Sequence, residues 1–155
     1  MKKETKKQLL IGAALVLELL FVLLYLNGGI DRLLDSDMSS EMILGQLLAR
    51  NNGILSDQWY YSTELRVLNT QLIYALFFRL SSNWHFVRMA STLVLWCVLI
   101  ASYGVLCRVM GCKKVLGVTA LLLAAPVSES YFRFVLAGVY YVPHLAIAFA
   151  ALALN

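Results

Sequence analysis

Long apolar runs separated by short polar segments dominate the chain. The first run, residues 8–26, follows a basic tip and is long enough to cross a bilayer as a helix at 1.5 Å rise per residue. A second run covers residues 86–106, a shorter one residues 115–127, and the last one residues 135–154. This pattern predicts an all-α, polytopic transmembrane protein, a single membrane domain over residues 1–155 with about four spans.

The segment between the first two runs, residues 27–86, is polar enough to lie outside the membrane. Asp37 is a good N-cap for a helix over residues 38–50. A second helix is predicted over residues 65–80, with a polar first half and an apolar second half. We therefore expect two extracytoplasmic helices at the membrane surface after the first span.

The third run is short, because Pro126 and Glu129 stop it. It crosses the membrane if its helix is short, or if the helix continues with Glu129 and Arg133 paired at positions i and i+4. The three cysteines, Cys97, Cys107 and Cys112, have neither disulfide nor zinc spacing, and we expect small buried side chains.

Composition supports the membrane class. The 155 residues are 61% hydrophobic and only 14% charged, which excludes a soluble domain with a wetted surface. The net charge of +4 does not indicate nucleic acid, because the basic residues stand at the ends of apolar runs, where they set orientation. The expected partner is the lipid bilayer, and no nucleic acid is expected.

The distribution of charge predicts the orientation. Residues 2–7 carry four lysines and one glutamate, and residues 108–114 add Arg108, Lys113 and Lys114, which makes seven bases against one acid. Residues 27–86 carry four arginines against six acids. By the positive-inside rule, the protein lies in the cell membrane as a multi-pass protein with its N-terminus in the cytoplasm and its acidic loop outside.

A cluster of four acids, Asp31, Asp35, Asp37 and Glu41, follows the first span. Asp35-Ser36-Asp37 is a DxD pair, and such carboxylates can serve as a general base for a hydroxyl or bind a divalent cation, Mg or Mn, through oxygen atoms. A DxD pair alone also fits a capping aspartate among solvated loop acids.

The layout of span, acidic loop, two surface helices and second span resembles the N-terminal part of bacterial GT-C integral-membrane glycosyltransferases, the class of protein O-mannosyltransferases and aminoarabinose transferases. The matching stretches are Asp35-Ser36-Asp37-Met38-Ser39-Ser40-Glu41-Met42, Asn51-Asn52-Gly53-Ile54-Leu55-Ser56-Asp57-Gln58-Trp59 and Ser62-Thr63-Glu64-Leu65-Arg66-Val67-Leu68-Asn69. The family has more spans than this chain, and the resemblance therefore implies either the N-terminal fragment of a longer protein or a reduced relative that has lost the rest of the catalytic domain.

The resemblance also implies the chemistry. The donor would be a polyprenyl-phosphate-linked sugar, and Asp35 or Asp37 would deprotonate the acceptor or bind a metal. Glu64 lies in the motif before the second surface helix, and Arg66 and Arg88 are candidates to bind the donor phosphate. Arg88 also fits a plain interfacial anchor. The chain departs from the family where it lacks the Asp-Glu pair and the proline-rich start of the second surface helix.

The segment Tyr140-Tyr141-Val142-Pro143-His144 is the other notable cluster, at the outer part of the last run. Tyr141 and His144 are candidates to line a sugar or lipid pocket. An aromatic belt at the membrane interface, with a histidine hydrogen-bonded between helices, explains the same residues.

Two functions therefore fit the sequence. The first is a membrane-embedded, inverting glycosyltransferase that moves a sugar from a polyprenyl-phosphate donor to an acceptor on the extracytoplasmic face. The alternative is a non-catalytic membrane subunit or transporter fragment whose acidic outer loop binds a partner or ligand. The variants Asp35→Asn and Asp37→Asn distinguish the two functions. A loop that only binds a partner would tolerate these substitutions, whereas a catalytic base or a metal site would not.

Overall fold

The computed structural model describes residues 3–61, 69–112 and 115–154, and all of their side chains except those of residues 3–4 and 30–33. Within these ranges the chain forms seven α-helices, one π-helix and no strand, which confirms the all-α class. Two helices are long and apolar enough to cross a membrane, and a bent pair of shorter helices would make a third span. The chain is a multi-pass membrane protein with two to three candidate spans.

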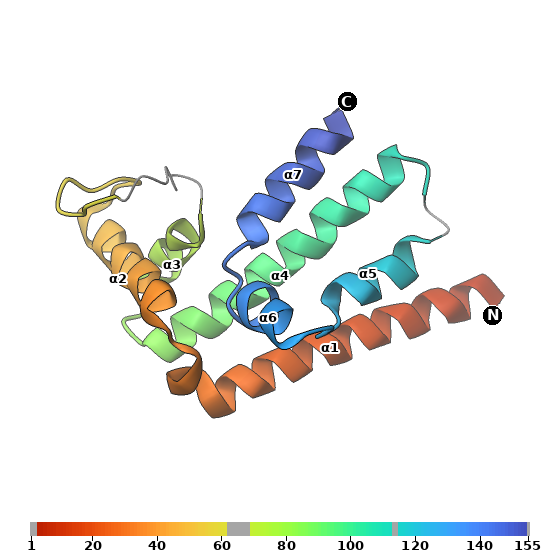
Figure 1. Cartoon of the computed structure of the whole chain (residues 1–155), viewed down its shortest axis with the longest axis horizontal. Coiled ribbons are helices and arrows are strands. Elements are labelled where there is room, and N and C mark those ends of the chain that lie inside the picture. The colour runs from red at the N-terminus through yellow and green to blue at the C-terminus, as the bar shows by residue number, and fades with distance from the viewer. Residues whose placement is uncertain (1–2, 62–68, 113–114, 155) are drawn as a thin grey trace.

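The two long helices form the frame of the molecule. Helix α1 covers Lys3–Leu33 and helix α4 covers Trp84–Val109, and the two pack against each other in opposite directions (Figure 1). Both helices are longer than the apolar runs 8–26 and 86–106. Helix α1 continues to a kink at Gly29. Helix α4 begins earlier, because the Asn83 side chain caps it by accepting from the Phe86 amide at 3.1 Å. We call the end of this frame that holds Lys7 and Arg108 the basic end, and the end next to Asp35 and Asp37 the acidic end.

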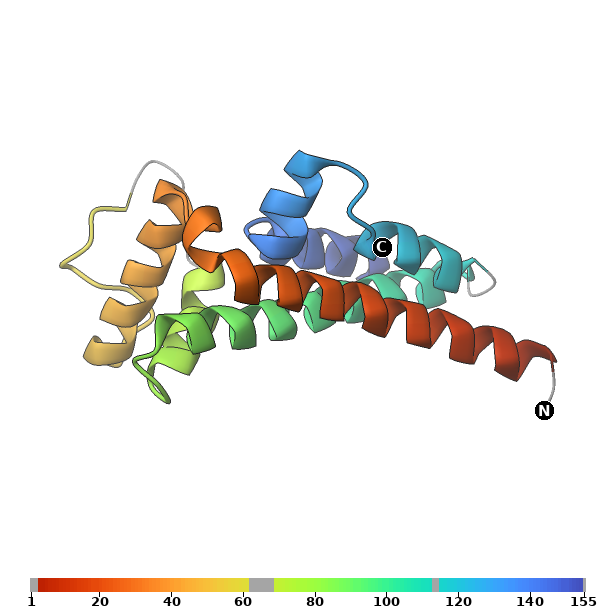
Figure 2. The same cartoon turned by 90° about the horizontal axis from the view of Figure 1, so that it is seen from below.

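Helix α2, Ser36–Asn51, lies at the acidic end (Figure 2). The expected cap was wrong by two residues, because Oδ1 of Asp35, rather than of Asp37, accepts the Met38 amide at 2.9 Å. Asp37 lies in the first turn instead. An acidic residue is favourable both at the N-cap and in the first turn, so local preference did not distinguish the two positions.

Helix α3, Thr70–Phe78, packs against α2 and α4. It begins later than the predicted residue 65, because Asn69 has an extended backbone with φ −137° and ψ −175°. Residues 62–68 lie outside the described part of the chain. Asn69 and Thr70 both bind a carboxylate of α2, which explains why the chain is extended here before the helix starts.

The third apolar run is bent. Helix α5, Leu116–Ala124, and the segment Glu129–Ala137, which holds α6 (Glu129–Tyr131) and the π-helix η1 (Phe132–Ala137), meet at 88°. Ala125 has the extended ψ of 141° that a following proline favours, and Pro126 cannot continue the helix. The alternative of one helix that continues through Glu129 and Arg133 was therefore wrong, and Nη2 of Arg133 lies 3.8 Å from Oδ2 of Asp35.

The last run is also broken. A continuous span over 135–154 was wrong, because η1 ends at Ala137 and helix α7 covers only Val142–Leu154. A helix through Pro143 would lose the hydrogen bond to the carbonyl of Val139 and would clash with it, and Val139 is the residue that adopts a left-handed φ of 51°. Helix α7 is apolar over its 13 described residues.

The apolar core lies where α1, α4, η1 and α7 meet. Its buried members include Leu26, Trp96, Leu99, Leu136 and Val142. The expectation of three buried cysteines was wrong for two of them, since only Cys107 is buried. Cys97 is exposed on the apolar surface of α4, and Cys112 is exposed in the turn that follows it.

Candidate functional site

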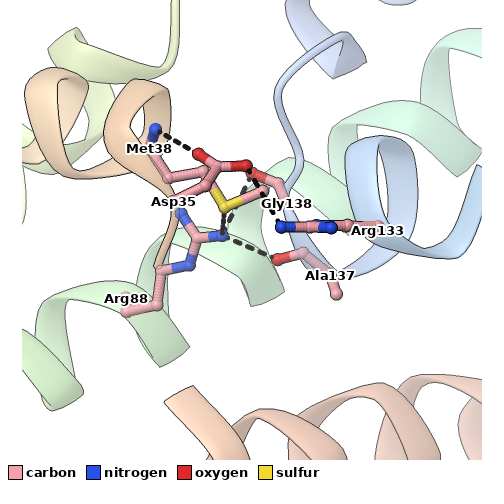
Figure 3. Close-up of polar contacts among 6 residues, drawn as sticks. All are labelled: Asp35, Met38, Arg88, Arg133, Ala137 and Gly138. Atoms are coloured by element: carbon pink, nitrogen blue, oxygen red, sulfur yellow. Dashed lines mark hydrogen bonds and ion pairs between the residues drawn. The ribbon is translucent and has the colours of Figure 1, made fainter. Parts of the chain in front are cut away.

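A buried arginine joins four elements at the acidic end. Arg88 of α4 is 1% exposed, and its guanidinium donates to the Tyr74 hydroxyl of α3 and, at 2.9 Å, to the Ala137 carbonyl that ends η1 (Figure 3). The same nitrogen, Nη2, lies 3.3 Å from both the Gly138 carbonyl and the sulfur of Met38 in α2. Arg88 therefore fixes the positions of α2, α3 and the chain after η1 relative to α4.

The partners of Arg88 are neutral dipoles. A charge inside a protein is costly unless its hydrogen bonds are made, and here two carbonyls, a hydroxyl and a thioether supply them. Burial raises the pKa of the Tyr74 phenol above its ordinary value of 10.0, and the nearby Arg88 charge opposes that shift. Tyr74 therefore stays neutral at physiological pH and accepts from the guanidinium.

A tight backbone segment follows η1 and presents its carbonyls to Arg88. A Cβ added at Gly138 would lie 2.3 Å from the Arg133 carbonyl oxygen and 2.6 Å from the Met38 methyl group, so only glycine fits there. Val139 has a φ of 51°, which costs on the order of 1–3 kcal/mol for a β-branched residue. Val139 is fully buried in the core, and this packing offsets the strain.

Asp35 has two kinds of partner. Oδ1 caps α2, and Oδ2 lies 3.8 Å from Nη2 of Arg133 in η1 (Figure 3). The two side chains are 26% and 42% exposed, so solvent weakens the ion pair. Nε of Arg133 is buried and has no hydrogen-bond partner within the described residues. Arg133 thus retains an unused donor beside the aspartate.

A cavity of about 120 Å³ lies beside this pair. It is lined by residues from α2 and from the chain around η1: Asp35, Asp37, Met38, Phe134, Tyr140 and Tyr141. Asp37 is exposed, and its carboxylate has no hydrogen-bond or ion-pair partner among the described side chains. The fold thus brings together two carboxylates and a tyrosine pair that are about a hundred residues apart in sequence.

Glu41 does not join the other acids. It is buried one turn further along α2, where its carboxylate accepts from Asn69 Nδ2 at 2.8 Å and from the Thr70 hydroxyl. Glu41 therefore fixes α3 against α2. The side chain of Asp31 lies outside the described ones, and the other three acids of the cluster are a cap, an exposed carboxylate and a buried structural carboxylate.

The described residues do not form a metal site made of protein side chains alone. No group of three or more His, Cys, Asp or Glu side chains in the described part of the chain is arranged to hold a metal ion. Asp35 already uses one oxygen for the helix cap and the other for Arg133. Mg²⁺ is commonly held by one or two carboxylates together with substrate phosphates, so a cation at Asp35 and Asp37 stays a prediction, and we derive no step through it.

The structure places the other predicted site residues as follows. Tyr141 is 49% exposed and lines the cavity, and the exposed His144 lies beside it with ring centroids 6.3 Å apart. Arg88 is hydrogen-bonded inside the protein and is not part of the cavity wall. Glu64 and Arg66 lie outside the described residues. A phosphate-binding role for Arg66 and Arg88 stays a prediction.

Sequence reasoning missed the main partner of Asp35. Arg133 was considered only as a partner for Glu129, because the third run was taken as one possible helix. Pro126 and Pro143 lie on either side of Arg133 in the sequence. They indicate that the segment between them does not continue the helices before and after it. Sequence reasoning also missed that Tyr74 binds Arg88 and that Asn69 binds Glu41. The polarity pattern placed both residues in a predicted helix but did not indicate their partners.

Comparison of the chain with protein families, with curated proteins and with solved structures finds no match.

Proposed function

We propose that the chain forms the acidic-loop region of a membrane-embedded, inverting glycosyltransferase of the GT-C kind. It would act at the acidic end of the spans, which we place on the outer face of the cell membrane, and take its sugar from a polyprenyl-phosphate donor. One observation carries the proposal. Asp35, Asp37 and Tyr141, three of the residues singled out as catalytic or substrate-binding, line the same cavity.

Asp37 is the better candidate for the base. Its carboxylate is exposed and free to accept a proton from an acceptor hydroxyl, whereas the carboxylate of Asp35 is held by the helix cap and by Arg133. In the proposed step, the acceptor oxygen bonds to the anomeric carbon as Asp37 takes its proton. The bond from that carbon to the phosphate oxygen breaks, and the polyprenyl phosphate leaves with the electron pair.

Arg133 is the accessible cation for the departing phosphate. It is 42% exposed, so part of its guanidinium group reaches solvent, although its Nε is buried. An exposed guanidinium binds phosphate oxygens well. Asp35 would then orient Arg133 as well as cap α2. The proposal assigns Asp37 to the acceptor side and Arg133 to the donor side of one site.

The size of the cavity sets what it can hold. At about 120 Å³ it is smaller than the roughly 300–1,000 Å³ of most ligand pockets, so it holds the reacting end of a substrate rather than a whole sugar and lipid. Tyr141 and His144 are exposed at its edge and can contact the rest of the sugar. The polyprenyl chain would remain in the bilayer.

The test is sugar transfer from a panel of radiolabelled polyprenyl-phosphate sugars by the native protein in membrane vesicles. We expect Asp37→Asn to lower kcat by about 10²-fold or more, since a general base contributes about that factor. Asp35→Asn retains a good capping side chain and should lower kcat less. Asp57→Asn, which replaces an exposed acid that does not line the cavity, is the matched control and should transfer normally.

Two outcomes would contradict the proposal. The first is a wild-type protein that transfers sugar from none of the donors, and the second is an Asp37→Asn variant as active as Asp57→Asn. In either case the acidic end is better explained as a non-catalytic surface that binds a partner or ligand.

A further inference from the structure

A larger cavity lies at the basic end, far from the acidic cluster. It measures about 570 Å³ and is enclosed by α1, α4 and α5. Its lining residues are mostly apolar or small, with polar ones at one side: Lys7, Gln8, Ile11, Gly12, Leu15, Ile100, Ala101, Gly104, Val105, Arg108, Leu116, Gly117 and Ala120. Nothing in the proposed glycosyl transfer uses this space.

Small residues create the cavity. A Cβ added at Gly12 of α1 or at Gly104 of α4 would meet no atom within 4 Å, so both glycines border open space. Gly117 of α5 closes the opposite wall, because a Cβ there would lie 2.4 Å from the Ile11 side chain. The helices therefore touch through Gly117 and Ile11 and separate around Gly12 and Gly104.

Two cations border the apolar space. Lys7 near the start of α1 and Arg108 near the end of α4 are both exposed, and neither forms an ion pair within the described side chains. The start of α1 and the end of α4 lie at the same end of the molecule (Figure 1), and Lys7 and Arg108 line the same cavity there. An occupant of this cavity thus meets positive charge at the membrane surface and apolar walls below it.

The volume favours a lipid over another helix. A helix about 10 Å across with a pitch of 5.4 Å fills roughly 420 Å³ per turn, so the cavity holds little more than one turn. A hydrocarbon chain fits a narrow apolar space of this kind. We infer that the cavity binds one anionic phospholipid, with its phosphate between Lys7 and Arg108 and an acyl chain along Gly12 and Gly104.

The test is lipid binding to the purified, delipidated protein, measured by native mass spectrometry during titration with phosphatidylglycerol or with phosphatidylcholine. We expect phosphatidylglycerol to bind at one site and at least tenfold more tightly. The double variant Lys7→Gln/Arg108→Gln should weaken phosphatidylglycerol binding by roughly 30-fold and remove the preference. Arg50→Gln/Arg79→Gln, which removes two exposed arginines near the acidic end, is the charge-matched control and should bind as the wild type.

Cavity filling provides a second test that does not depend on charge. Gly104→Leu should block both lipids because the new side chain occupies the open space. Gly28→Leu adds the same side chain at an exposed glycine that is not part of the cavity, and it should leave binding unchanged. Glycine in a helix interior is a poor helix former, so both substitutions should preserve the fold.

Three results would overturn the inference. Equal binding of both lipids to the wild type would show that the cations do not select the headgroup. Unchanged binding in Gly104→Leu would place the lipid elsewhere. A wild-type protein that binds neither lipid and runs as a dimer, which Gly104→Leu converts to a monomer, would show that a second copy covers the cavity.

Discussion

Arg88 shows how much of the arrangement at the acidic end depends on one side chain. Its guanidinium is the hydrogen-bond donor for the Tyr74 hydroxyl and for the carbonyls of Ala137 and Gly138. Without it, these acceptors would be buried and unpaired, and each such group costs about 1–3 kcal/mol. Arg88 therefore acts mainly through the positions of the elements that line the cavity.

We predict that Arg88→Met lowers the free energy of unfolding by about 3 kcal/mol, because it leaves buried acceptors without a donor. The measurement is the unfolding midpoint of the purified protein in detergent, followed by tryptophan fluorescence. Arg79→Met is the control, since Arg79 is exposed at the end of α3. If both variants unfold at the same midpoint, the buried hydrogen bonds do not contribute to stability.

Among helices, the contact of α2 with α3 depends on a missing side chain. A Cβ at Gly45 would lie 2.6 Å from Cβ of Tyr74 and 3.0 Å from the Gln71 carbonyl oxygen. In the sequence, Gly45 stands among the apolar residues of this helix. The structure shows that it allows the two helices to approach closely.

We predict that Gly45→Ala destabilises the packing of α3 on α2 by about 1–3 kcal/mol, the usual cost of overpacking. Amide hydrogen exchange of Thr70–Phe78 should become faster, and this is the readout. Gly28→Ala makes the same change at a helical glycine with open space around it, and it should be neutral or slightly stabilising. Unchanged exchange in Gly45→Ala would show that the helices can separate at no cost.

The whole molecule separates its charges between two ends, and this predicts its orientation. Cys112 is exposed in the turn at the basic end, beside Arg108. Cys107 is buried, and Cys97 lies on the apolar surface of α4, a candidate span, where a water-soluble reagent does not reach it. The positive-inside rule places Cys112 in the cytoplasm.

A membrane-impermeant maleimide should therefore label the protein only after the cells are permeabilised, and Cys112→Ser should remove the label. Tyr60 is 92% exposed in the segment after α2, so Tyr60→Cys in the Cys112→Ser background should be labelled in intact cells. Labelling of Cys112 in intact cells would reverse the orientation and would place the acidic end inside the cell.

Local sequence was sufficient for the membrane class and for the two long helices. An unbroken apolar run can satisfy its backbone hydrogen bonds in lipid only as a helix, so runs 8–26 and 86–106 define α1 and α4 without any partner. The break before α7 could also be predicted from the sequence, because Pro143 disfavours a continuous helix. The prediction of one span over residues 135–154 did not take this proline into account.

Other features depended on residues that are distant along the chain. Asp35 and Asp37 fit a helix start equally well; in the folded chain Asp35 is the cap, and both carboxylates line a cavity with Tyr140 and Tyr141. Chain breaks before α6 and after η1 place η1 at the acidic end. Only this placement allows Asp35 to pair with Arg133, and Arg88 to bind the carbonyls at the end of η1. The sequence determined which segments become helices in the bilayer, because periodicity and charge are local properties of the chain. Only the tertiary structure decided which side chains are in contact, because these contacts depend on the packing of residues that are distant in sequence.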